Sequence, residues 1–200
     1  MRMDLKPVNV ASASLREDEK ALVRREVDRD ETVYLLKKAN ATFFALPLFG
    51  YFVAGVVVLL LSLYMFSWAT LLLLPLAALL MGCHLLAYKV NKECIQLVTN
   101  KRVLTISCVK PSAPVKVRYC NLTTGMQMRT AFARGSHANV VFVPAAEEFD
   151  TFEKNKKPGS DEKPPFTEVI FINENVAELK AFINGLTSML DRCGKLPYRY

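Results

Sequence analysis

The stretch Glu93–Ser107, ECIQLVTNKRVLTIS, decides how the second half of the chain folds. Two short apolar segments flank the polar corner Thr99–Arg102, a pattern that predicts an antiparallel β-hairpin. Four residues separate this hairpin from a long uncharged tract that ends at Tyr88. With so short a connection, we expect the hairpin to begin a domain that is held close to whatever surrounds the tract.

The tract itself predicts a membrane anchor. Residues 39–88 contain no Asp, Glu, Lys or Arg, which is more than twice the roughly 20 residues that one membrane-spanning helix needs. The tract divides near Ser67, so we expect one transmembrane helix over 42–66 and a second over 69–88. Their short connection predicts a tight helical hairpin, because backbone polar groups in lipid need internal partners. A signal peptide is not expected, since the tract follows a strongly charged segment.

The charges that flank the tract predict its orientation. Lys37 and Lys38 precede the first expected helix, Lys89 and Lys92 follow the second, and the connection between the helices has no cation. The excess of positive charge on one side places both termini in the cytoplasm or the mitochondrial matrix. An integral protein of a bacterial or a mitochondrial inner membrane satisfies this rule.

The charged N-terminal arm, residues 1–41, is expected to be partly helical. Ser14 and Glu17 have the spacing of a capping box at the start of a helix. Leu22 and Val27 are candidate contacts of this helix, either with the C-terminal domain or with a partner protein. A solvated helix held by salt bridges is the other interpretation.

The pattern changes to alternation after the tract and predicts a C-terminal domain over 93–192. Short alternating segments indicate several antiparallel strands, and residues 144–166, rich in proline and charge, indicate an exposed insertion. Apolar residues at helical spacing after Asn175 predict an amphipathic helix that ends near Gly194, with a tail over 193–200. The expected fold is an α+β membrane protein in which this helix covers a curved antiparallel sheet.

This order of parts resembles the bacterial pleckstrin-homology-like proteins of the membrane-flanked type. The resemblance rests on Asp30–Tyr34 before the tract, on Leu97–Leu104 around the corner, and on Phe171–Asn173 before the last helix. It covers roughly residues 30–190 and implies a pleckstrin-homology-like sheet or barrel capped by the C-terminal helix. The sequence departs from the family at Ser107–Val109, where members often have glycine. The family is defined mostly by fold, so the resemblance implies no particular activity.

No motif of the sequence indicates catalysis. It has no P-loop, no GxSxG and no dinucleotide fingerprint, and its two histidines, His84 and His137, lie in different segments. His84 is expected to be a neutral residue near the membrane surface. The five cysteines form no CxxC pair, which favours reduced packing residues over disulfides or a zinc site. We therefore expect a protein that is not an enzyme and that uses no cofactor and no metal.

Basic residues supply the candidate binding surface. Cations beside a membrane contribute about 1 kcal/mol each toward an anionic surface, and the candidate lipid head-group contacts are Lys89, Lys92, Lys101, Arg102, Lys110, Lys116 and Arg118. Nucleic acid is not an expected partner, because no aromatic platform accompanies these cations. We favour a membrane-anchored scaffold or accessory subunit of a larger membrane complex with protein partners. The alternative is a membrane-anchored module that senses anionic lipids.

Overall fold

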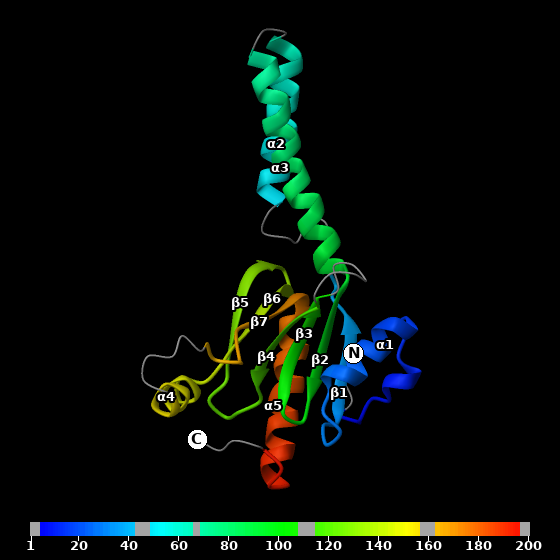
Figure 1. Ribbon diagram of the computed structural model, residues 1–200, viewed down its shortest axis with the longest axis vertical. Coiled ribbons are helices and arrows are strands. Elements are labelled where there is room, and N and C mark those ends of the chain that lie inside the picture. Colours follow the sequence, from blue (N-terminus) through cyan, green and yellow to red (C-terminus); the bar gives the residue numbers. More distant parts are fainter. Residues whose placement is uncertain (1–4, 43–48, 66–68, 108–114, 157–162, 197–200) are drawn as a thin grey trace.

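The computed structural model describes residues 5–42, 49–65, 69–107, 115–156 and 163–196. A helical stalk rises from a body that contains the sheets, the N-terminal arm and the C-terminal helix (Figure 1). In chain order the elements are η1 (Val10–Ser12), α1 (Glu17–Glu26), β1 (Val33–Lys38), α2 (Phe49–Met65), α3 (Ala69–Lys92), β2 (Cys94–Thr99), β3 (Arg102–Ser107), β4 (Lys116–Asn121), β5 (Gln127–Arg134), β6 (His137–Val143), α4 (Ala146–Asn155), β7 (Val169–Asn175) and α5 (Val176–Arg192).

Two antiparallel sheets and α5 enclose the main core. The four-stranded sheet has the order β1-β2-β3-β4, and the three-stranded sheet has the order β5-β6-β7. Apolar side chains of both sheets and of α5 belong to one buried cluster, for example Val98, Phe142 and Leu186. The α+β class is therefore confirmed, but two separate antiparallel sheets replace the expected curved sheet or barrel.

The β2–β3 corner forms as predicted, and its own polar side chains close it. The hydroxyl oxygen of Thr99 accepts hydrogen bonds from the backbone N–H groups of Lys101 (3.1 Å) and Arg102 (3.0 Å). Asn100 accepts a bond of 2.8 Å from the backbone N–H of Thr32. Every residue of β2 is buried, because the main core lies on one face of the sheet and α1, through Val23, covers the other.

The prediction of two transmembrane helices is wrong. Among the described residues, one helical segment is long and apolar enough to cross a membrane, Leu73–Lys92 within α3. Helix α2 is apolar but has 17 residues, Phe49–Met65, and falls short of the roughly 20 that a span needs. The absence of charge describes the composition of the tract but does not show where a helix begins and ends. The length of a span depends on those two ends. The expected turn residues 66–68 lie outside the described part of the chain.

The N-terminal arm belongs to the body instead of preceding it. Its last segment is strand β1, which pairs with β2 through Leu36 and Leu97, so the stalk is inserted between two neighbouring strands of one sheet. Helix α1 begins at Glu17, two residues after the expected start. Its first turn is closed by Glu19, whose carboxylate accepts a bond of 2.9 Å from the backbone N–H of Arg16. Glu19 can do so because a salt bridge to Lys38 (2.8 Å) holds it in a buried position.

The expected exposed insertion, 144–166, contains a helix in its described part. Helix α4 follows β6, and the rings of Phe149 and Phe166 lie 5.1 Å apart in an edge-to-face arrangement. The C-terminal helix matches its prediction: the Asn175 side chain accepts from the backbone N–H of Glu178 (3.4 Å), and Gly194 has the positive φ of a helix stop (64°). Residues 157–162 and 197–200 lie outside the described residues.

Candidate functional site: the stalk end of the two sheets

The stalk presents large apolar side chains to its surroundings. Leu63 and Leu79 are 61% and 63% exposed, and Tyr64 is 89% exposed. The backbones of α2 and α3 approach closely at Gly55, where a Cβ atom would lie 2.7 Å from Cγ of Met81. The two helices therefore pack tightly against each other and leave an apolar outer surface, which is suited to lipid or to an apolar protein partner.

His84 lies inside the contact between α2 and α3. It is buried, and its ring centroid is 5.8 Å from that of Phe49 and 5.5 Å from that of Phe52. No group of three or more His, Cys, Asp and Glu residues that could hold a metal occurs in the part of the chain that the structure describes.

The stalk joins the sheet through a short and well-bonded connection. Helix α3 ends at Lys92 and β2 begins at Cys94. The thiol of Cys94 donates to the backbone carbonyl of Val90 (3.3 Å), and the backbone N–H of Ala39, just after β1, donates to the carbonyl of Cys94 (2.8 Å). The two strands that carry the stalk are thus bonded to each other where α3 enters the sheet, and a single residue, Glu93, separates α3 from β2.

The predicted basic residues divide between the two ends of the sheet. Lys89 and Lys92 are exposed on the last turns of α3. Lys116 lies at the same end, because its register partner Ser107 pairs with Cys94 at the start of β2. Arg118 is two residues farther along β4. The structure therefore gathers these four cations where the stalk meets the sheet, while Lys110 lies outside the described residues.

Lys101 and Arg102 lie at the opposite end of β2, and acidic residues of the arm neutralise them. Arg102 donates to the nearly inaccessible carboxylate of Glu31 (2.8 Å) and contacts Asp28 (3.3 Å), while Lys101 pairs with Asp30 (2.5 Å). The six residues of β2 separate these cations from the stalk by about 20 Å. Their predicted role at a membrane beside the stalk does not fit this position, because sequence proximity to the tract said nothing about the direction of the strand.

Leu22 and Val27 are used inside the chain. Both are partly buried against the cluster of Val23, Ile95 and Leu104 on the outer face of the four-stranded sheet. Among the alternatives that the sequence left open, the structure shows packing on the C-terminal domain. Helix α1 is therefore part of the body, and its apolar face is not free for a partner protein.

Local sequence patterns did not reveal a buried polar connection between the two sheets. Lys37 of β1 forms a salt bridge with Glu174 of β7, which is almost fully buried. With its amide oriented to satisfy both neighbours, Gln96 of β2 donates to Glu174 (3.1 Å) and accepts from the backbone N–H of Ile172 (2.9 Å). The sequence presents Lys37 only as a charge that flanks the tract. The available signal was Gln96, a polar residue among the apolar residues of β2.

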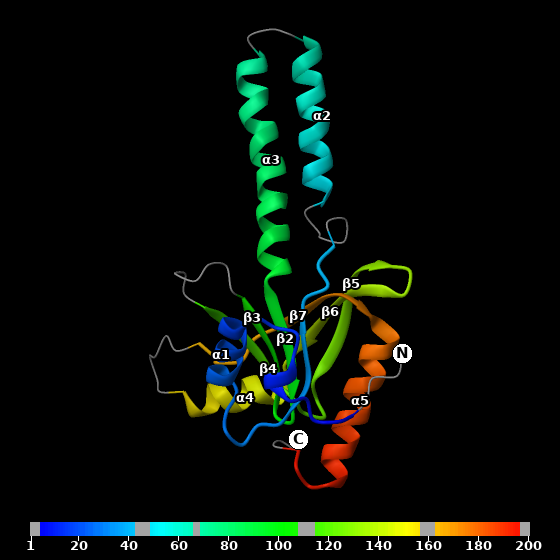
Figure 2. The same cartoon turned by 90° about the vertical axis from the view of Figure 1, so that its right-hand side faces the viewer.

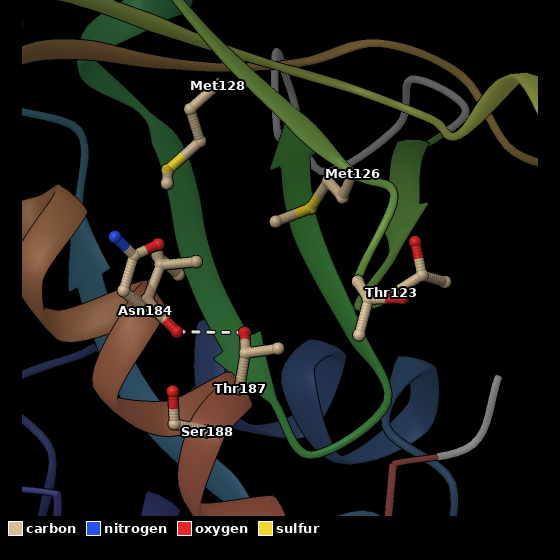
Figure 3. Close-up of a pocket in the computed structure, with 8 residues that line it drawn as sticks. Thr123, Met126, Met128, Asn184, Thr187 and Ser188 are labelled. Carbon is tan, nitrogen blue, oxygen red and sulfur yellow. Dashed lines mark hydrogen bonds between the residues drawn. The ribbon is translucent and has the colours of Figure 1, made fainter. Parts of the chain in front are cut away.

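An open pocket of about 370 Å³ lies between the start of β5 and the outer side of α5. Figure 3 shows Met126 and Met128 on one side and Asn184, Thr187 and Ser188 of α5 on the other. The described lining mixes apolar and hydroxyl or amide groups and contains no ionisable side chain. Such a lining can bind part of a peptide or a small apolar group. It supplies no side chain that could act as a general acid or base.

The buried titratable groups beside β4 are Cys120 and Glu148, and neither is among the residues that line this pocket. Burial raises the pKa of the Cys120 thiol to about 12, with a smaller contribution from the charge of Glu148. Burial also raises the pKa of the Glu148 carboxyl, against the opposing hydrogen bond from Asn121. A neutral thiol is a poor nucleophile, so the environment of Cys120 suits packing.

The chain was compared with families, curated proteins and solved structures. No family model, curated protein or solved structure matches it. The resemblance to the membrane-flanked pleckstrin-homology-like proteins therefore stays a prediction.

Proposed function

We propose that the chain is a non-catalytic scaffold or accessory subunit that its apolar stalk attaches to a membrane. The observation that carries the proposal is the stiff junction of Lys92, Cys94 and Ala39, which fixes the body relative to the stalk. Helix α3 supplies the candidate span and α2 packs beside it. A body fixed in this way presents its free surfaces at a constant distance and angle from the bilayer, which is what a docking platform requires.

The surface that best suits a protein partner is the edge of the three-stranded sheet. Strand β5 is at the edge of its sheet, and most of its residues are exposed. The pocket lined by Met128 and Ser188 lies directly beside it. An edge strand next to an apolar pocket is a common way to bind an extended peptide, because backbone hydrogen bonds supply affinity and the pocket supplies specificity.

Purification in mild detergent tests this proposal. The full chain should co-purify from its native membrane with a stoichiometric partner, identified by mass spectrometry. Asn184→Arg with Ser188→Arg places two large cations at the pocket and should reduce the bound partner at least tenfold. Ala177→Arg, at an exposed position two turns along α5 from Asn184, should leave the partner bound. A chain that purifies alone, or loses its partner equally in both variants, would overturn the proposal.

A second candidate function is recognition of anionic lipid head groups. The observation in its favour is that Lys89, Lys92, Lys116 and Arg118 lie at the stalk end of the sheet. Each cation near an anionic surface contributes about 1 kcal/mol. This candidate uses a smaller set of residues than the sequence indicated, because Lys101 is paired at the opposite end.

Thermal unfolding of the detergent-solubilised chain tests this second function. A short-chain phosphatidylglycerol should raise the midpoint by a few degrees, and short-chain phosphatidylcholine should not. Lys116→Glu with Arg118→Glu should abolish the difference, whereas the matched change Lys101→Gln should retain it. Equal shifts with both lipids in the unmodified chain would exclude head-group recognition.

A further inference from the structure

The β5–β6 hairpin has an exposed aromatic tip among cations. Phe132 is 61% exposed at this tip, and Arg129 and Arg134 lie on either side of it in β5, both exposed. The hairpin belongs to a long segment without any Asp or Glu, from Cys94 to Ala146. Arg129 donates to the neutral side chain of Gln127 (3.1 Å). The tip is therefore both apolar and positively charged.

The backbone at the tip holds Phe132 in an unfavourable conformation. Phe132 has φ of 53°, a region that a bulky residue rarely adopts. The pairing of β5 with β6 shifts register between Ala131 and Arg134, and Gly135 follows with φ of 60°. Because the ring is mostly exposed, packing within the body does little to compensate for the backbone strain. Strained residues of this kind concentrate at binding and switch sites.

Three contacts place the tip on the stalk side of the body. The backbone N–H of Val176 donates to the carbonyl of Ser136 (3.1 Å), next to the tip. Ala138 of β6 pairs with Glu174 of β7, and Glu174 forms the salt bridge with Lys37, shortly before the stalk. Figure 1 and Figure 2 agree with these contacts: the closed end of the β5–β6 hairpin lies level with the lower end of α3.

We propose that the β5–β6 tip is a second membrane contact, in which the Phe132 ring enters the interfacial layer and Arg129 and Arg134 contact anionic head groups. This inference rests on the attachment of the stalk to a membrane. A bilayer is the occupant that fits, because the tip lies level with the lower end of α3 and combines an aromatic ring with cations. Aromatic rings favour the membrane–water interface, and nearby arginines are attracted to its negative potential.

Two separate contacts would fix the tilt of the body against the bilayer. The stalk junction at Cys94 restrains the body at one point, and the tip lies at the edge of the other sheet, on the far side of β7 from the stalk strands. With both points held, the pocket beside β5 keeps a defined orientation toward the membrane plane.

Fluorescence quenching by lipid tests the second contact. Trp68 is the only tryptophan, so Trp68→Phe provides a background into which Phe132→Trp introduces one probe. The full chain is reconstituted into vesicles of phosphatidylglycerol and phosphatidylcholine, the latter brominated near the head-group end of its acyl chains. The matched control is Phe149→Trp in the same background, because Phe149 is an exposed aromatic (39%) on α4, which follows the far end of β6.

Quenching at position 132 should be at least twofold greater than at position 149. Arg129→Gln with Arg134→Gln should reduce the quenching at 132 in vesicles rich in phosphatidylglycerol, and much less in pure phosphatidylcholine. Flotation of the vesicles reports attachment by the stalk independently. A chain that floats with the vesicles but shows equal quenching at both positions would overturn the inference and leave the attachment intact. A chain that does not float would overturn the attachment, and the second contact with it.

Discussion

Two hairpins of the body point toward opposite ends and carry the same kind of charge in different surroundings. At the β2–β3 corner, Arg102 and Lys101 contact carboxylates of the arm, including Glu31. At the β5–β6 tip, Arg129 and Arg134 lie beside an exposed Phe132 in a segment without acids. The corner lies at the end of the body away from the stalk, and the tip lies at the end nearer to the stalk.

The two hairpins show that the role open to a cation depends on whether neighbouring acids compensate its charge. The corner lies closer in sequence to the apolar tract, yet its two cations hold the arm against the sheet. The tip lies about 30 residues farther along the chain, and the strand directions bring it level with the lower end of α3. We assign a stabilising role to the corner and a binding role to the tip, and the substitutions below test each role.

The largest effect is expected from Arg102→Ala at the corner. The change leaves the buried Glu31 carboxylate without the guanidinium that donates to it at 2.8 Å, and breaking one side of a buried pair costs about 3 kcal/mol. Urea unfolding of the detergent-solubilised chain, followed by circular dichroism, measures the loss. A loss below about 1 kcal/mol would mean that this pair does not hold the arm.

Glu31→Gln removes the charge and retains an acceptor for Arg102. Burial raises the pKa of the Glu31 carboxyl above its ordinary value near 4.5, against the opposing contacts of Arg102. The folded chain therefore binds more protons than the unfolded chain at pH values between the ordinary pKa and the raised pKa. The contribution of Glu31 to stability falls as the pH rises through this range and is constant above it.

The variant lacks this titration. Its stability relative to the unmodified chain should increase between pH 4.5 and neutral pH, as measured by urea unfolding at each pH. A relative stability that decreases over the same range would reverse the assigned direction of the pKa shift. Because the hydrogen bond is kept, the effect at neutral pH should be smaller than that of Arg102→Ala.

Phe132→Asn at the tip should stabilise the body. Asparagine adopts positive φ more readily than phenylalanine, and release of the strain at φ 53° should add about 1 kcal/mol to the free energy of unfolding. The matched change Ala131→Asn, one residue earlier and without positive φ, should give no gain. A loss of stability at position 132 would indicate that the ring packs within the body, contrary to the binding role.

The smallest effect is expected from Lys101→Ala. Its pair with Asp30 is largely exposed, and exposed ion pairs contribute little to stability because water screens their charges. The difference from the unmodified chain should shrink further at 0.5 M salt, because salt screens exposed charges. A cost equal to that of Arg102→Ala would remove the distinction between buried and exposed pairs at the corner.

Local patterns predicted several elements correctly. Thr99 and Asn100 close the corner that their residue types indicated, and the apolar spacing after Asn175 gives α5. The errors arose where the pattern of one element resembled that of another. Strand β1 resembles part of a charged arm, because Lys37 and Lys38 follow only a short apolar run. The apolar tract divides into two expected spans only because the sequence does not show where α2 begins and ends.

The tip was visible in the sequence but could not be recognised there. Phe132 between Arg129 and Arg134, in a segment without acids, is an available signal. Whether the ring is exposed depends on the register shift after Ala131, and its side of the body depends on the pairing of β6 with β7. Neither follows from local periodicity, because both are contacts between distant parts of the chain.

Neighbouring residues alone specify three features of this protein: the apolar tract, the β2–β3 corner and the amphipathic C-terminal helix. Hydrophobic periodicity and turn chemistry act over a few residues, so these features can be read directly. Contacts between distant segments were needed to establish which cations are paired, that the stalk enters between β1 and β2, and that the closed end of the β5–β6 hairpin lies level with the lower end of α3. These outcomes depend on strand direction and register, which are fixed when the two sheets and α5 bury a common core.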